Sequence, residues 1–171
     1  DVDDIYEFYG VRKNFEVKKL WHPNLKGGAL LYTLAIFFYL LVNKKFNLVY
    51  GRFLHGCYVA ALLKNKVIFE SHTTIFEEKN HRLIVFKKLI KNRYFKKMIV
   101  ISQALKNKYL ENGYLNNIRI QVAHDGADEV TNFNCKIKLL GYKNNLKVGY
   151  VGHLYKGKGL EIIKLISDKV D

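Results

Sequence analysis

Hydrophobic residues occur along this chain in two alternating patterns. Short runs rich in Val, Ile and Phe predict buried strands, and longer segments with apolar residues three or four positions apart predict helices. The strand runs are residues 15–20, 47–50, 66–70, 98–102, 118–123 and 148–151. The helical segments are residues 29–42, 56–64, 80–93 and 103–112. Strands that alternate with helices in this way predict an α/β fold built on a parallel sheet.

Three of the helical segments carry more specific signals. Residues 29–42 contain no charge and are fewer than the roughly 20 residues that cross a bilayer, so we expect a buried helix rather than a membrane span. Residues 80–93 are amphipathic, with lysines opposite the apolar positions. Ser102 is the predicted N-cap of the following helix, and Gly113 the glycine that ends it.

Polar residues that could bind a ligand or transfer a proton lie at the ends of two of the predicted strands. Glu70 ends the predicted strand at residues 66–70 and His72 comes just after it, and Arg52 follows residues 47–50. In open parallel sheets, ligands bind at the carboxyl ends of the strands. His72 is therefore either a substrate-binding or proton-transferring residue, or a polar strand end before the next helix. Arg52 either clamps an anionic group or forms a structural ion pair with Glu70.

Two further segments are candidates for ligand contacts. The turn at residues 124–128 contains Asp125, which either binds a sugar hydroxyl or only shapes the turn. Residues 147–163 form a strand, a glycine-rich turn with Lys156 and Lys158, and a helix start. Backbone N–H groups and cations in that arrangement can hold phosphate. The segment lacks the Walker A pattern.

Charge and cysteine content narrow the class of partner. Of the 171 residues, 29 are Lys or Arg and 15 are Asp or Glu, a net charge of +14. The excess favours an anionic partner, unless lysine is simply frequent throughout the source proteome. Cys57 and Cys135 lie far apart without metal-ligand spacing, and the start of the chain has no signal-peptide pattern. Both features suit a reducing cytoplasm.

Five segments in order resemble the retaining glycosyltransferases of GT-B fold, known as group 1 or family 4. They are LVYGR (48–52), VIFESH (67–72), VISQALKNKYLENG (100–113), QVAHDGAD (121–128) and VGYVGHLYKGKGLE (148–161). The resemblance implies two Rossmann-like domains with helices on both faces of each sheet. It also implies hexosyl transfer with retention, from a nucleotide-sugar bound by the C-terminal domain to a glycan or lipid-linked acceptor bound by the N-terminal domain. No metal or other cofactor is expected.

The resemblance also assigns roles to single residues. His72 matches the family histidine that faces the donor sugar, so it is the expected catalytic residue. Lys158 matches the lysine that neutralises the donor diphosphate, whereas His153 stands where the family has arginine, and Lys156 is the nearest compensating cation. The implied donor-binding residues are Gly152, His153, Lys158 and Gly159. The expected supporting residues are Arg52, Glu70 and Asp125.

Two departures from the family pattern shape the predicted domains. The family's N-terminal glycine-rich loop is not visible, and its paired glutamates are not found before Asp171. We therefore expect an N-terminally truncated acceptor-side domain at residues 1–128, a crossing at 129–145 and the start of a donor domain at 146–171. A chain of this extent is expected to be inactive alone.

Two other functions and one further partner stay open at this point. A basic nucleic-acid-binding module is supported by charge alone, and a GT-B epimerase or phosphorylase would share the fold. The cations of residues 80–97 form either a solvated face or a contact with anionic lipid. We expect a cytoplasmic protein, with peripheral contact to the inner face of the membrane as an option. The Lys- and Asn-rich composition suits a bacterial surface-polysaccharide pathway, such as that of lipopolysaccharide.

Overall fold

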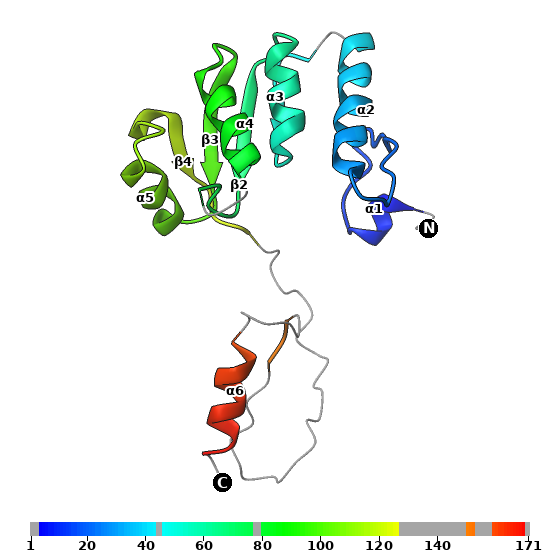
Figure 1. The fold of residues 1–171 in the computed structure, drawn as a ribbon. Helices are drawn as coiled ribbons and strands as arrows, with labels where there is room; N and C mark the ends of the chain where they lie inside the picture. Colours follow the sequence, from blue (N-terminus) through cyan, green and yellow to red (C-terminus); the bar gives the residue numbers. More distant parts are fainter. Residues whose placement is uncertain (1–3, 44–45, 77–79, 127–149, 153–158, 170–171) are drawn as a thin grey trace. The chain divides into compact units, whose positions relative to one another are not determined.

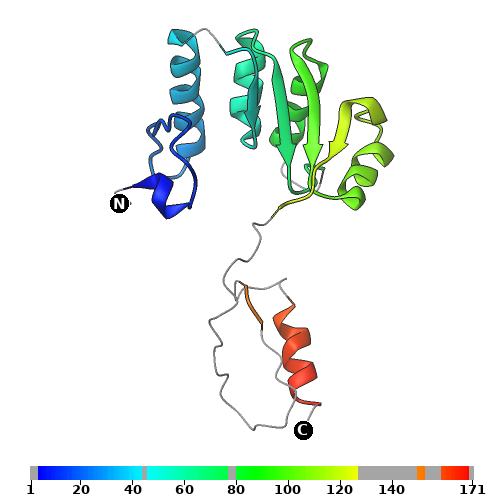
Figure 2. The same cartoon turned by 180° about the vertical axis from the view of Figure 1, so that it is seen from behind.

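The structure is a computed structural model that describes residues 4–43, 46–76, 80–126, 150–152 and 159–169. The chain divides into two units, Asp1–Gly126 and Ala127–Asp171, each of which is described by itself. Figure 1 and Figure 2 show the elements from two opposite sides.

The first unit is built on a parallel sheet of four strands in the order β1-β2-β3-β4. The strands are β1 (Val49–Gly51), β2 (Val67–Ser71), β3 (Phe95–Val100) and β4 (Ile120–Val122). Ser71 pairs with Val100, and Val100 pairs with Val122, so three strands end at the same level. The α/β class with a Rossmann-like parallel sheet is confirmed. Residues that follow these strands are thereby brought to one edge.

Three helices connect successive strands and cover the same face of the sheet. They are α3 (Leu54–Leu62), α4 (Asn80–Lys91) and α5 (Gln103–Glu111). Figure 2 shows the strands in front of α3 and α4. Phe86 of α4 lies between Phe69 of β2 and Tyr109 of α5, with ring centroids 6.3 and 5.7 Å away. All three rings are almost fully buried, so they form the centre of the core. Helices on the opposite face stay a prediction.

Helix α2 (Gly28–Val42) forms where the uncharged run predicts a helix. The expectation that this helix is buried is wrong. It packs beside α3, which covers only one of its sides. Of its apolar residues, Leu40 alone is buried, and a stripe remains exposed: Leu30, Leu34, Phe38, Leu41 and Val42. Among the described residues, no helix is both long enough and apolar enough to cross a membrane.

Local signals in the sequence are mostly reproduced at the element ends. The hydroxyl of Ser102 accepts a hydrogen bond from Leu105 N at 3.2 Å and caps α5. Gly113 follows that helix with φ 69°, a backbone conformation that favours glycine. The predicted strand at residues 15–20 is wrong: this segment has no strand partner and is largely exposed. Its three charged residues leave too little apolar surface to pack on the sheet.

The N-terminal segment and the β3–β4 connection each add a short element. Helix α1 (Ile5–Phe8) begins after Asp4, whose carboxylate accepts from two backbone N–H groups. The 3₁₀ turn η1 (Asn117–Arg119) leads directly into β4.

The second unit is described only in part. Helix α6 (Leu160–Ser167) begins after Gly159, which has φ 79°, at the predicted helix start. Tyr150 and Val151 are exposed and not in a strand, which corrects the strand expected at residues 148–151 as far as these two residues go. The expected bounds of the crossing and of the donor domain stay a prediction.

Candidate functional site

Four polar side chains meet where β1 and β2 end. Tyr50 pairs with Ile68 in register, which places Arg52 beside Glu70 as the strands run on. Residues two apart in a strand lie on the same face, so Tyr50 and Arg52 share a face, as do Glu70 and His72. Parallel pairing of β1 and β2 therefore places all four residues on the same face of the sheet.

Glu70 is the centre of this strand-end network. One of its carboxylate oxygens, Oε2, accepts a hydrogen bond from the Tyr50 hydroxyl, and the other, Oε1, accepts from Nε2 of His72. Nε of Arg52 lies 3.8 Å from the same Oε1 atom. The Glu70 side chain is only 15% exposed, whereas that of Arg52 is 63% exposed. The carboxylate is thus fixed by its neighbours, and Arg52 remains at the solvent side.

The two ring nitrogens of His72 have different partners, which defines its tautomer. Nη2 of Arg52 lies 3.0 Å from Nδ1 of His72. A guanidinium only donates, so Nδ1 must accept and carries no proton. Nε2 then holds the ring proton and donates it to Glu70. In this arrangement Nδ1 of His72 is an acceptor nitrogen, and Arg52 is its hydrogen-bond partner within the described residues.

Electrostatics at the network follow from the same contacts. The hydrogen bond to Glu70 raises the pKa of Tyr50 to about 12, because ionisation would put two anions together. The pKa of Glu70 is lowered, first by the hydrogen bond from Tyr50 and further by His72 and Arg52, against the opposing effect of burial. Glu70 is therefore an anion that aligns the three surrounding donors.

Two hydroxyl groups donate hydrogen bonds to the backbone just after His72. Ser71 Oγ donates to the carbonyl oxygen of Thr73 at 2.7 Å, and the Tyr109 hydroxyl donates to the same oxygen at 3.0 Å. Tyr109 is fully buried in α5. These bonds tie the turn that carries His72 to the core and so limit the movement of its ring.

A cavity of about 360 Å³ opens beside His72. Its lining includes Thr73 and Thr74 from the turn and Leu105 and Lys108 from α5. That volume is within the range of small-ligand sites, roughly 300–1,000 Å³. The cavity offers hydroxyl groups, one cation and the histidine to a polar ligand.

The remaining predicted site residues are not part of this network. Asp125 is exposed after β4, and within the described part of the chain it has no hydrogen bond or ion pair. Gly152 and Gly159 belong to the second unit, whose position relative to His72 is not described. His153, Lys156 and Lys158 lie outside the described residues. Nowhere in the described ranges do three His, Cys, Asp or Glu residues form a metal-binding group.

Sequence reasoning missed two residues of the site. Tyr50 has a readable signal, because it stands two positions before Arg52 and so shares its face of the strand. Tyr109 has none, because it resembles any apolar position of the amphipathic helix α5. Its hydroxyl becomes relevant only when the fold brings it under Thr73.

Comparison with known proteins supports the resemblance seen in the sequence. The chain is similar to a protein of Methanocaldococcus jannaschii that is named as an uncharacterized glycosyltransferase. The two are 36% identical over 118 residues, which cover 61% of this chain and 30% of the relative. The chain thus spans less than a third of that relative's length. No protein-family model matches the chain.

The expected resemblance to glycosyltransferases is thereby confirmed, and the parallel α/β sheet agrees with it. In both fold and sequence, the chain is similar to a glycosyltransferase.

Proposed function

We propose that this chain supplies the acceptor-side domain and the start of the donor domain of a GT-B glycosyltransferase. The enzyme would transfer a hexosyl group from a nucleotide-sugar to a glycan or lipid-linked acceptor, with retention and without a metal. The observation that carries this proposal is the network around Glu70, which orients the ring of His72 at the carboxyl edge of a parallel sheet. The named glycosyltransferase relative supports the same class.

His72 would act through its Nδ1 atom. Glu70 fixes the ring by accepting from Nε2, so Nδ1 is the nitrogen left for a ligand. A sugar hydroxyl that donates to Nδ1 would replace the N–H of Arg52 there. The exchange costs little, because the Arg52 side chain is 63% exposed and water can accept its N–H when it leaves Nδ1.

Arg52 would gain a second role when it leaves His72. A guanidinium released at this edge can bind a phosphate or carboxylate of the donor or acceptor. Without a metal, protein cations have to stabilise the leaving diphosphate. The resemblance gives Lys158 this task, with Gly152, His153 and Gly159 around it. Because His153 is charged only when protonated, a further cation such as Lys156 would be needed at neutral pH.

Substitution of His72 tests the proposal in the protein with its complete donor domain. His72→Ala should lower the turnover of sugar transfer by about a hundredfold, because a hydrogen bond made in the transition state is lost. Nucleotide-sugar affinity, measured by calorimetry, should stay nearly unchanged. His22→Ala is the matched control, since His22 is exposed and packs only on Tyr32 of α2 in the described contacts.

Unchanged turnover in His72→Ala would remove the role given to this histidine. Loss of activity in both histidine variants would show a general effect on folding instead. If no nucleotide-sugar binds to the complete protein, the transferase proposal itself fails.

A further inference from the structure

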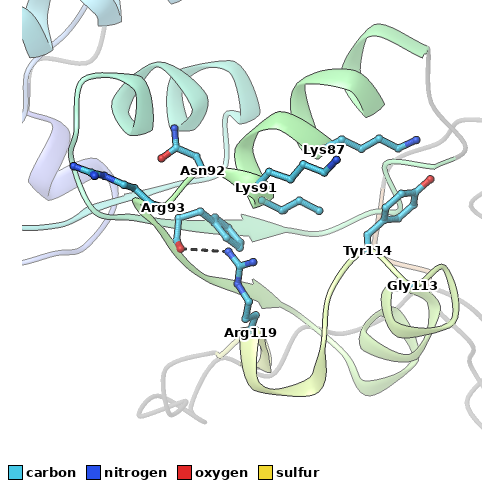
Figure 3. A pocket seen from close by; sticks show the side chains of 9 residues that line it. Lys87, Lys91, Asn92, Arg93, Gly113, Tyr114 and Arg119 are labelled. Atoms are coloured by element: carbon cyan, nitrogen blue, oxygen red, sulfur yellow. Dashed lines mark hydrogen bonds between the residues drawn. The ribbon is translucent and has the colours of Figure 1, made fainter.

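A second, larger cavity lies at the opposite end of the sheet from His72. It has a volume of about 740 Å³ and opens where β3 and β4 begin. Figure 3 shows that its side chains come from α4, from the α4–β3 turn and from the segment between α5 and β4. The residues of the lining with polar side chains are Lys87, Lys91, Asn92, Arg93, Tyr114 and Arg119. Four of these six residues are cations.

Arg119 is held firmly at the floor of this cavity. Its guanidinium donates to the carbonyl oxygen of Phe95 at 3.3 Å and lies 4.7 Å from the centre of the Phe95 ring. β4 begins to pair at Ile120, opposite Met98, so the first residues of β3 extend beyond it. The Arg119 side chain lies beside these first residues of β3, where β4 has not yet begun. Its remaining N–H donors are therefore positioned before any ligand arrives.

Lys87 and Lys91 stand one helical turn apart on α4 and reach over the same cavity (Figure 3). The ammonium group of Lys87 lies 5.0 Å from the centre of the Tyr114 ring, so this lysine is directed across the opening rather than into free solvent. Arg93 points away from these three cations and donates to the Tyr94 hydroxyl, which places it at the rim.

In the described part of the chain, no negative charge balances these cations. The cavity lining contains no carboxylate, and none of the four cations forms an ion pair within the part of the chain that the structure describes. Like charges one turn apart on a helix repel each other. Burial also lowers the pKa of Arg119, a sign that its charge is incompletely solvated. An anion in the cavity would relieve both effects.

A purely solvated lysine face explains these residues less well. Lys88, on the same helix, is exposed and does not line the cavity, as such a face requires. Lys87 and Arg119 are instead half-buried and packed on aromatic rings. Packing of this kind fixes the charges in place, which is what a binding site needs.

We propose that this cavity is a binding site for a phosphate-bearing ligand, held by Lys87, Lys91 and Arg119. The phosphate belongs either to a lipid headgroup or to a free phosphorylated molecule, which offer the same chemistry to these donors. The site is about 17 Å from the carboxyl edge of the sheet, because β3 runs between them at about 3.3 Å per residue. It is therefore separate from the transfer site and does not depend on the transferase proposal.

Calorimetry with inorganic pyrophosphate tests the free ligand. Lys87→Gln/Lys91→Gln should weaken pyrophosphate binding by about tenfold or more, because two charge-assisted hydrogen bonds are lost. The matched control is Lys88→Gln/Lys106→Gln, which removes the same charge outside the cavity lining and should leave binding nearly unchanged. Circular dichroism checks that both variants keep the fold.

Vesicle sedimentation distinguishes the source of the phosphate. The ligand is an anionic lipid headgroup if the wild-type chain binds phosphatidylglycerol vesicles but not phosphatidylcholine vesicles, and if this binding is lost in the cavity variant and kept in the control. If only pyrophosphate binding is lost, the ligand is a free phosphorylated molecule. The proposal is overturned if neither probe binds, or if the cavity variant and the control lose binding equally.

Discussion

Replacement of Glu70 by Gln is predicted to lower the pKa of Tyr50. In the structure, the hydrogen bond from Tyr50 to the Glu70 carboxylate raises this pKa from 10.0 to about 12. The neutral amide of Gln would still accept the hydrogen bond, but it would not repel the tyrosinate. The variant should therefore lose a substantial part of the shift.

The expected decrease is about one pH unit, which corresponds to about 1.4 kcal/mol of coupling. This is less than the full shift, because Tyr50 is 55% exposed and solvent screens the pair. A raised pKa means that the folded state holds the Tyr50 proton more tightly than the unfolded chain. The corresponding stabilisation is present below pH 10 and is lost as the pH rises towards 12.

Carbon-13 NMR of labelled tyrosine ring carbons measures this titration directly. The chain has 12 tyrosines, so the Tyr50 signal is identified by its absence in Tyr50→Phe. Glu111→Gln is the control, because it removes an exposed carboxylate from α5 and should leave Tyr50 unchanged. The reasoning is refuted if Tyr50 titrates near 10 in the wild-type chain, or at the same pH in wild type and Glu70→Gln.

Three further predictions follow from the site and the core. Lys158→Ala should weaken nucleotide-sugar affinity in the complete protein, and equal affinity by calorimetry would count against the diphosphate role of Lys158. Tyr109→Phe should lower the free energy of unfolding by about 1 kcal/mol in urea titrations, because one hydrogen bond to Thr73 is lost while that from Ser71 remains. Phe86→Ala should cost about 3–5 kcal/mol in the same titration, since its ring is fully buried, and a loss under 1 kcal/mol would contradict the aromatic core.

Helices and strands with a regular spacing of apolar residues were predictable from the sequence. Their first and last residues were harder to predict. The apolar run at residues 98–102 indicates β3, but the strand already begins at Phe95. Lys96 and Lys97 conceal that start, because they read as solvated charges. Lys97 in fact lies along the sheet and donates to Gln121 on β4 at 3.2 Å.

Burial depends on neighbours that a local pattern does not contain. The uncharged run of α2 predicts a helix correctly, yet its contacts with α3 and with neighbouring loop residues such as His22 leave much of its surface exposed. Residues 15–20 fail as a strand for a different reason, because their three charges leave too little apolar surface to pack on the sheet.

The functional residues also differ in how far the sequence predicts their position. Arg52 and His72 follow strands directly and Glu70 lies near the end of β2, so a parallel sheet alone brings the three to one edge. The cavity with Arg119 was not predictable, because this residue meets Lys87 and Lys91 only through the packing of α4 beside the start of β4. No spacing in the sequence relates them.

The most direct test of the central claim is sugar transfer itself, measured in the protein with its complete donor domain. A panel of nucleotide-sugars is incubated with acceptor glycans and lipid-linked acceptors in the presence of EDTA, and products are identified by mass spectrometry. The account predicts a glycosylated product and a released nucleoside diphosphate, both lost in His72→Ala. Product formation that is unaffected by His72→Ala, or no diphosphate release from any donor, would contradict it.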